Sequence, residues 1–208
     1  MVINFEGVAC VGGVPEPVEV AALWLRWAGR SWYEVGSPTA LIRPPEGTEI
    51  RSVDGRIAGI PRAPLDKARP APEVLGELER PMAGPGFRLV AHGAGAESLV
   101  PRRQRKHCPA LAAMPWIDTV GMARAVLPRR ESYRLEALRE HYQIGSPAER
   151  HRAGPGVRLA TEIFLRLLAD GGAPGCWRDL ASLEQVAGRA PSCPPLAGGQ
   201  RAGEVAVR

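Results

Sequence analysis

The alternation of apolar segments with Gly- and Pro-rich connections predicts the elements at the start of the chain. Residues 2–6 are a short apolar run typical of a buried strand, and residues 18–27 are dense in apolar and β-branched side chains. Residues 31–35 predict another strand directly afterwards, which would complete a meander. The Ala and Leu content of residues 18–27 also allows a helix, so periodicity alone leaves both interpretations open.

Further along, shorter apolar runs predict strands, and the segments around them have helical spacing. The strands are expected at residues 87–91 and 116–118. The helices are expected at residues 72–82, 96–106, 119–127, 132–142, 157–168 and 177–186, with Ser132 as the N-cap of its helix. This order of strands and helices predicts an α/β domain with a mixed sheet.

Length and composition fit one domain followed by a tail. The chain has 208 residues, of which 45% are hydrophobic, and this is enough for a sizeable core. We expect the domain to occupy residues 1–188. Residues 189–208 are rich in Pro, Gly, Ala and Arg, a composition that predicts a disordered tail.

Cysteine usage and hydropathy favour a cytoplasmic protein. The four cysteines have no C-x-x-C spacing, and no His lies at zinc-finger spacing. The N-terminus lacks the basic and apolar regions of a signal peptide, and no apolar stretch approaches the ~18–20 residues that span a bilayer. We therefore expect reduced cysteines, a cytoplasmic location and no membrane partner.

The charge of the chain is compatible with a polyanionic partner. The formal net charge is +5, and a basic run at residues 102–107 contains Arg102, Arg103 and Arg105. Such a run could contact the phosphates of a nucleic acid. The alternative is an ordinary solvated surface, because many basic proteins never bind nucleic acid.

Several segments, taken in order, carry a family resemblance. They are VINFEG at residues 2–7, VEVAAL at 18–23, LIRPPEGTEI with GRIAGIPRAPL at 41–65, LVAHGAGAE at 89–97, WIDTVGMARAVLP at 116–128, SYRLEAL at 132–138 and HRAGPGVRLATEIFLRLL at 151–168. Together they resemble the DEDDh 3′–5′ exonucleases, the group that contains the DNA polymerase III epsilon subunit and ribonuclease T. The resemblance covers residues 1–169 and implies a ribonuclease-H-like mixed sheet flanked by helices.

The resemblance also implies a two-metal active site. In that chemistry two divalent ions, about 3.5–4 Å apart, hold the attacking and leaving oxygens of the phosphodiester. Carboxylates supply the charge and the oxygen ligands that Mg²⁺ prefers. A histidine whose pKa lies near the working pH serves as general base on the attacking water.

Matched to the family motifs, this chain keeps only part of that set. Glu6 matches the Glu of the first motif, Glu97 stands at the position of an Asp, and His151 matches the general base. Asn4 and Gly156 stand where two further Asp residues are expected. Asn offers one neutral oxygen to a metal, and Gly offers no side-chain ligand.

The incomplete set changes the expected chemistry. Two cations so close repel strongly unless carboxylates neutralise them, so we expect at most one Mg²⁺ or Mn²⁺ ion, weakly held by Glu6 and Glu97, or none. Pro155 and Gly156 are also expected to interrupt the start of the last motif's helix. Family-like hydrolysis should then fall by orders of magnitude.

The family resemblance and the basic run also supply candidate substrate-binding residues, which are Asn4, His92, Arg102, Arg103 and Arg105. For His92 the alternative is a structural role at the end of a strand. For Asp118 a helix cap is favoured over a metal ligand, because Asp before Thr is a common N-cap arrangement.

Three hypotheses of function follow. The first is a catalytically impaired pseudo-exonuclease that binds a nucleotide or the 3′ end of single-stranded DNA or RNA. The second is an active 3′–5′ exonuclease with a non-standard metal site built on Glu6, Glu97 and His151. The third is a fold repurposed for a small-molecule ligand or substrate, since a fold does not determine function.

Overall fold

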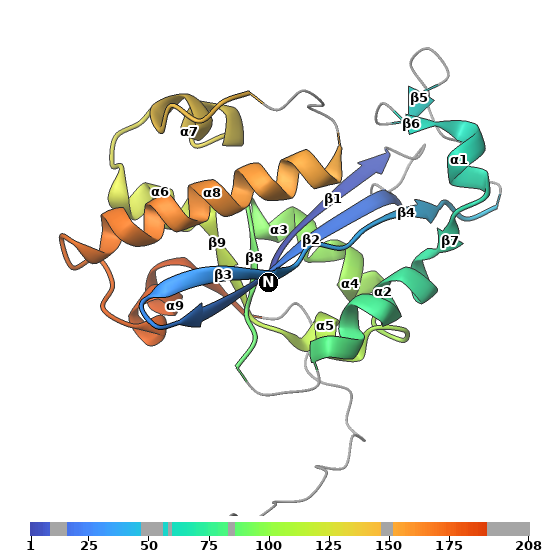
Figure 1. The fold of residues 1–208 in the computed structure, drawn as a ribbon, viewed down its shortest axis with the longest axis horizontal. Helices are drawn as coiled ribbons and strands as arrows, with labels where there is room; N and C mark the ends of the chain where they lie inside the picture. Colours follow the sequence, from blue (N-terminus) through green and yellow to red (C-terminus); the bar gives the residue numbers. More distant parts are fainter. Residues whose placement is uncertain (9–15, 47–55, 58–59, 83–85, 147–151, 191–208) are drawn as a thin grey trace, which may run out of the picture.

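A mixed β-sheet organises the molecule, with helices on both faces (Figure 1). The computed structural model describes residues 1–8, 16–46, 56–57, 60–82, 86–146 and 152–190. The sheet order is β10-β9-β8-β1-β2-β4-β7, with β3 paired to β2. The strands of this sheet are β1 (Val2–Val8), β2 (Glu16–Ala28), β3 (Ser31–Gly36), β4 (Thr39–Arg43), β7 (Arg69–Pro70), β8 (Leu89–Ala91), β9 (Trp116–Asp118) and β10 (Gly188–Arg189).

The strands run in both directions. β1 is antiparallel to β2 and parallel to β8, and β8 is parallel to β9. The amino group of Met1 donates a hydrogen bond to the carbonyl oxygen of Arg88 at 2.8 Å, next to the parallel pairing of Val2 with Val90. A separate two-stranded ribbon joins β5 (Arg56–Ile57) to β6 (Ile60–Pro61).

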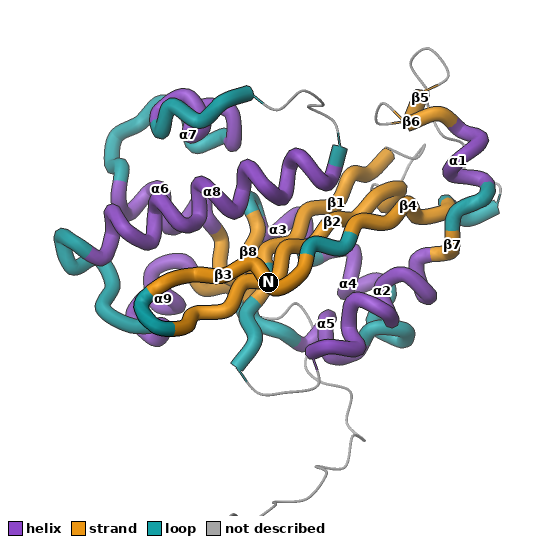
Figure 2. Tube along the Cα trace, in the orientation of Figure 1, coloured by secondary structure: helices purple, strands orange, loops and turns teal. Residues whose placement is uncertain are grey.

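Each face of the sheet is covered by its own helices (Figure 2). One layer contains α6 (Thr119–Val126), α7 (Leu135–His141), α8 (Ala153–Gly172) and α9 (Leu180–Ala187). The other contains α2 (Ala71–Glu79), the 3-10 helix η1 (Arg80–Met82), α3 (Ala94–Glu97), α4 (Leu99–Arg103) and α5 (Pro109–Ala113). The short α1 (Arg62–Asp66) packs on β4 through Leu65.

The period-two alternation of β1 separates two cores. Val2 packs with α8 residues such as Val157 and Ile163 on one side, while Ile3 packs with α2 residues such as Leu75 on the other. All five side chains are buried. The central strand is therefore apolar on both faces near its start, as expected for a strand covered on both sides.

The structure confirms the predicted α/β class and mixed sheet. Residues 18–27 are strand and not helix, because their apolar side chains fill both cores. Strand β4 was missed, since its five residues lie between a turn and Pro44-Pro45. The helix expected at residues 96–106 is wrong in form: it is divided between α3 and α4, which meet at Ser98.

Two expectations about helix starts were wrong, and a third is confirmed. Ser132 is not an N-cap, since α7 begins at Leu135 after Arg134. The last motif's helix is not interrupted, because α8 begins at Ala153 and runs through Pro155. Pro155 lies in the first turn, where its missing N–H has no helical partner to lose. Asp118 does cap α6, its carboxylate accepting from the Val120 amide at 3.0 Å.

The predicted division at residue 188 remains a prediction. Gly188 and Arg189 pair with β9, and residues 191–208, most of the expected tail, lie outside the described residues. Within the described part of the chain, no helix is both long enough and apolar enough to cross a bilayer. The cytoplasmic location also stays a prediction.

Candidate functional site

Strand β1 directs the side chains of Asn4 and Glu6 to one face of the sheet. Side chains two residues apart on a strand share a face, and Val2 on this face packs against α8. Asn4 therefore faces the first turn of α8, where Gly156 lies. The structure thus brings together in space the two positions at which the family resemblance expects carboxylates.

Asn4 fills the space in front of Gly156. A Cβ atom built on Gly156 would lie 2.7 Å from Asn4 Nδ2 and 3.3 Å from Asn4 Cγ. Real Cβ atoms almost never show the shorter distance, so any side chain at position 156 needs Asn4 to move. The two neutral residues are complementary in shape, and neither carries a charge to this side of the site.

Glu97 lies at the end of α3 against the other side of β1. The backbone N–H of Phe5 donates to Glu97 Oε2 at 3.0 Å. Burial raises the pKa of the Glu97 carboxyl from 4.5 to about 8, the Phe5 hydrogen bond opposes this change, and the charge of Glu6 adds to it. Glu97 is therefore expected to hold a proton at neutral pH when no cation is close by.

A buried ion pair beside these residues was missed by the sequence analysis. Glu19 lies opposite Glu6 in the antiparallel register of β1 and β2 and is only 1% exposed. Arg152 Nε donates to its two carboxylate oxygens at 3.1 and 3.0 Å, and Arg152 Nη2 donates to Oε1 at 2.7 Å. The amide of Ala153, at the N-terminus of α8, donates to Oε2 at 2.8 Å.

The sequence did carry a signal for this pair. Glu19 is a single carboxylate inside the apolar run VEVAAL, and a carboxylate in a buried strand requires a partner that neutralises it. The signal does not identify the partner, because Arg152 is 133 residues away along the chain. Only the packing of α8 on the sheet brings them together.

His92 has a structural environment at the end of β8. Its Nδ1 lies 2.8 Å from Thr119 Oγ1, and burial lowers the pKa of the imidazole, with the charge of Asp118 opposing that change. Asp118 accepts hydrogen bonds from the amide of Gly93 at 3.0 Å and from Arg189 Nε at 2.9 Å. These contacts tie β8, α6 and β10 together, and a role of His92 in substrate binding stays a prediction.

The basic run lies at the carboxyl end of β1. Arg102 and Arg103 are exposed on α4, and Arg103 Nη1 lies 3.3 Å from Glu16 Oε1. Glu16 pairs with Val8 in the sheet, two residues beyond Glu6. Arg105 is exposed just after α4. The remaining candidate, His151, lies outside the described residues, although its neighbour Arg152 anchors to Glu19.

The candidate residues that the structure describes do not fit a pair of divalent ions. Among the described residues, no three His, Cys, Asp or Glu side chains are grouped so that they could hold a metal. Glu6 and Glu97 are the carboxylates of the candidate set, and Asn4 contributes one neutral oxygen. Such a set could hold at most one ion, because position 156 on α8 supplies no carboxylate ligand.

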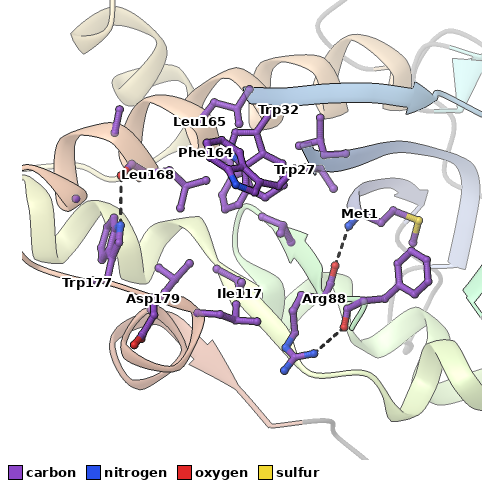
Figure 3. A pocket seen from close by; sticks show the side chains of 18 of the residues that line it. Met1, Trp27, Trp32, Arg88, Ile117, Phe164, Leu165, Leu168, Trp177 and Asp179 are labelled. Carbon is purple, nitrogen blue, oxygen red and sulfur yellow. Dashed lines mark hydrogen bonds between the residues drawn. The ribbon is translucent and has the colours of Figure 1, made fainter. Parts of the chain in front are cut away.

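A separate cavity of about 700 Å³ lies at the opposite end of α8 (Figure 3). Its walls are largely apolar and include Trp27 and Trp32 from the β2–β3 hairpin and Phe164 from α8. Trp177 closes one side, with its indole N–H donating to the carbonyl oxygen of Leu168 at 3.3 Å. Asn4, Glu6, Glu97 and Gly156 do not line this cavity.

Comparisons with known proteins support the same architecture. No protein-family model matches the chain, and a search of curated proteins found no significant match. Among solved structures, a full-length 3′-exonuclease is 20% identical with a TM-score of 0.67, and the match covers 82% of this chain and 60% of that one. This chain thus spans about 60% of the length of that exonuclease.

Two further structures match over most of their own length. The nuclease domain of 3′hExo, described as a DEDDh family member and solved with rAMP bound, is 18% identical with a TM-score of 0.67, covering 82% of this chain and 91% of that one. Exonuclease X, solved with 5′ overhanging duplex DNA, is 22% identical with a TM-score of 0.59, covering 89% and 97%. The chain has the fold of the DEDDh-type 3′-exonucleases, which confirms the fold that the motifs predicted.

Proposed function

We propose that this chain is an exonuclease-fold protein that binds the 3′ end of a single-stranded nucleic acid, or a nucleotide, and cleaves it slowly or not at all. The contact between Asn4 and Gly156 is the observation that carries the proposal. It replaces two expected carboxylates with a pair of neutral residues that fill each other's space. The first and last metal-binding positions of the motif set are thus lost together.

The electrostatic consequence is large. Two divalent ions about 4 Å apart repel each other strongly in a partly dry site, and carboxylates normally offset that repulsion. Here the carboxylates of Glu6 and Glu97 remain, while Asn4 and Gly156, which contact each other, are neutral. We infer that at most one Mg²⁺ or Mn²⁺ ion binds, and that it binds weakly.

Glu19 does not replace the missing ligands. Its carboxylate lies next to Glu6 in the sheet, but its two oxygens already accept hydrogen bonds from the guanidinium of Arg152 and from the amide of Ala153. A metal ion would have to displace a cation that already neutralises this buried charge. The arrangement favours a locked structural pair over a substitute metal ligand.

A proton competes with a metal ion for the carboxyl group of Glu97. Because the pKa of Glu97 is raised to about 8, binding of a cation at neutral pH must release that proton. The affinity of the single ion should therefore rise with pH until the carboxyl is ionised. Weak binding near pH 7 follows from the same burial that holds Glu97 against Phe5.

Binding of nucleic acid rests on different residues from cleavage. Arg102, Arg103 and Arg105 provide cations at the carboxyl end of β1, where they could contact phosphates. The matching structures of 3′hExo and exonuclease X were solved with rAMP and with duplex DNA. Loss of metal ligands removes the charge needed for hydrolysis and leaves this basic surface in place.

Titration calorimetry with Mn²⁺ and Mg²⁺ tests the metal part of the proposal. Wild-type protein should give at most one weak site, and the variant Asn4→Asp/Gly156→Asp should bind more tightly. Asn4→Asp alone is the matched control, and it should change affinity little, because position 156 still supplies no ligand. Two tight sites in the wild type would overturn the proposal.

A further inference from the structure

The cavity beside the C-terminal half of α8 has the size of a small-molecule site. Its volume of about 700 Å³ lies within the range of about 300–1,000 Å³ that is typical of such sites. Packed protein interiors leave few voids larger than a water molecule, so a space of this size requires an arrangement of elements that holds its walls apart. Figure 3 shows the side chains that form these walls.

Three elements hold the walls of the cavity apart. The β2–β3 hairpin forms one wall, because residues 24–28 of β2 pair with β3 alone among the described strands and extend beyond the start of β1. α9 forms a second wall through Leu180 and Leu183, and Val90 and Ile117 line the side of the sheet. α8 forms the third wall with residues at helical spacing, which are Phe164, Leu165, Leu168, Ala169 and Gly172.

Three charged side chains line the cavity, and two of them have partners in the protein. The guanidinium of Arg88 pairs with Glu184. The carboxylate of Asp179 caps α9 and accepts a hydrogen bond from the amide of Ser182 at 2.8 Å. Arg178 is exposed, and its guanidinium forms no hydrogen bond or ion pair with the residues that the structure describes. The walls therefore offer one cation, at the edge that faces water.

Apolar side chains are exposed around the mouth of the cavity. Six large hydrophobic residues are exposed in the described part of the chain, and three of them line this cavity: Trp27 at 56%, Trp32 at 40% and Leu180 at 43%. The ring of Trp32 lies 6.3 Å from that of Phe164 between centroids, so contact with α8 holds this indole in the wall. Apolar surface in water is unfavourable in proportion to its area, and an apolar molecule that entered the cavity would remove it from water.

We propose that this cavity binds a small amphipathic acid, whose apolar body lies between the hairpin and α8 and whose acidic group pairs with Arg178. The polar groups of Arg88 and Asp179 are already bound, so a strongly polar ligand body would lose its hydration without gaining partners. The guanidinium of Arg178 can form charge-assisted hydrogen bonds with one acidic group that stays near water. Asn4, Glu6, Glu97 and Gly156 do not line this cavity, so the inference does not rest on the proposed function.

Titration calorimetry of the full chain with decanoate as the probe tests the proposal. Wild-type protein should bind one decanoate per chain with a negative heat-capacity change, because apolar surface leaves water. Ala169→Trp places an indole in the α8 wall and should weaken binding roughly tenfold or more, since the chain of the ligand loses its space. Ala181→Trp, at an exposed alanine of α9 outside the cavity, is the matched control and should bind like the wild type.

Circular dichroism checks that both tryptophan variants stay folded. Absence of decanoate binding by the wild type would overturn the proposal. Binding that a folded Ala169→Trp leaves intact would also overturn it, because the ligand would then adsorb outside the cavity.

A substitution at Arg178 separates the acidic group from the apolar body. Arg178→Gln should weaken decanoate binding by about two- to fivefold, as expected for an exposed ion pair, and should leave the binding of decanol unchanged. Arg26→Gln, at an exposed arginine of the hairpin that does not line the cavity, should change neither. Unchanged binding of decanoate by Arg178→Gln, or an equal loss for decanol, would overturn the pairing of the acid with Arg178.

A lipid surface and a second copy of the chain are the alternative occupants of the mouth. Wild-type protein should stay in the supernatant when phosphatidylcholine vesicles are sedimented. Sedimentation with the vesicles would assign the exposed tryptophans to a lipid surface. Light scattering that shows a dimer which excludes decanoate would assign them to a second copy. Either result would overturn the proposal.

Discussion

The carboxylates at the two ends of the candidate site, Glu97 at α3 and Glu19 at α8, are neutralised in different ways. At the end of α3, burial raises the pKa of Glu97 to about 8, and the charge of Glu6 adds to this change. Beside α8, Asn4 and Gly156 carry no charge, and the nearby carboxylate of Glu19 is neutralised by Arg152. A proton thus neutralises Glu97 at neutral pH, whereas an arginine neutralises Glu19.

If the site has lost its ions as proposed, the difference teaches that a fold can keep the positions of a metal site while losing the charge that holds the metal. α8 still packs its first turn against β1, and Ala153 still begins that helix beside Glu19. Packing of the apolar face of α8 requires only Val157, Ile163 and their neighbours, not the residue at position 156. Loss of ligand charge therefore need not disturb the scaffold.

The largest expected effect on stability comes from breaking the ion pair between Arg152 and Glu19. Arg152→Ala leaves the carboxylate of Glu19 buried without its cation and should lower the free energy of unfolding by about 3–5 kcal/mol, somewhat less if water reaches the site. Arg103→Ala, which breaks the more exposed pair with Glu16, is the matched control and should cost at most about 1 kcal/mol. Urea unfolding measures both. Equal losses would mean that burial does not distinguish the two pairs.

The raised pKa of Glu97 should make the stability of the protein depend on pH. The folded pKa of Glu97, about 8, lies above its ordinary value of 4.5, so the folded protein holds a proton that the unfolded chain releases. Stability should therefore fall as pH rises from about 4.5 to 8, by at most about 1.4 kcal/mol per pH unit. Glu97→Gln should flatten this dependence and keep the Phe5 hydrogen bond, whereas Glu34→Gln, at an exposed site, should not. An unchanged slope in Glu97→Gln would contradict the raised pKa.

A smaller effect is expected where the two neutral residues meet. Gly156→Asp alone requires the amide end of the Asn4 side chain to move and should cost on the order of 1 kcal/mol. In Asn4→Asp/Gly156→Asp two carboxylates repel each other, so the variant should be stabilised by Mn²⁺ to a degree that wild type is not. Thermal unfolding with and without Mn²⁺ measures this difference. Equal Mn²⁺ responses in the two proteins would show that the missing carboxylates do not limit metal binding.

The smallest effect concerns the basic run. If Arg102, Arg103 and Arg105 contact phosphates, changing all three to Ala should weaken single-strand binding and reduce the slope of log affinity against log salt by up to about 3. Arg62→Ala, on α1, provides a control with an exposed Arg elsewhere on the surface. Fluorescence anisotropy over a range of salt concentrations makes the comparison. No change in slope would assign the three residues to an ordinary solvated surface.

Sequence patterns predicted the fold better than the site. The apolar runs located β1, β2, β8 and β9, since a strand covered on both faces has few polar positions. The motifs assigned Asn4 and Gly156 to one candidate site, but they did not predict that the two residues contact each other. They also missed the link between Glu19 and Arg152, and they wrongly let Pro155 break α8. Each of these depends on how α8 docks on the sheet, which no local pattern contains.

The most direct test of the account is a trimming assay on a single-stranded oligonucleotide labelled at its 5′ end, with Mg²⁺ or Mn²⁺. The same purified protein is assayed for binding by anisotropy. The account predicts measurable binding of the 3′-end substrate and little or no shortening from that end. Processive 3′ trimming by the wild type that Glu6→Ala abolishes would contradict it.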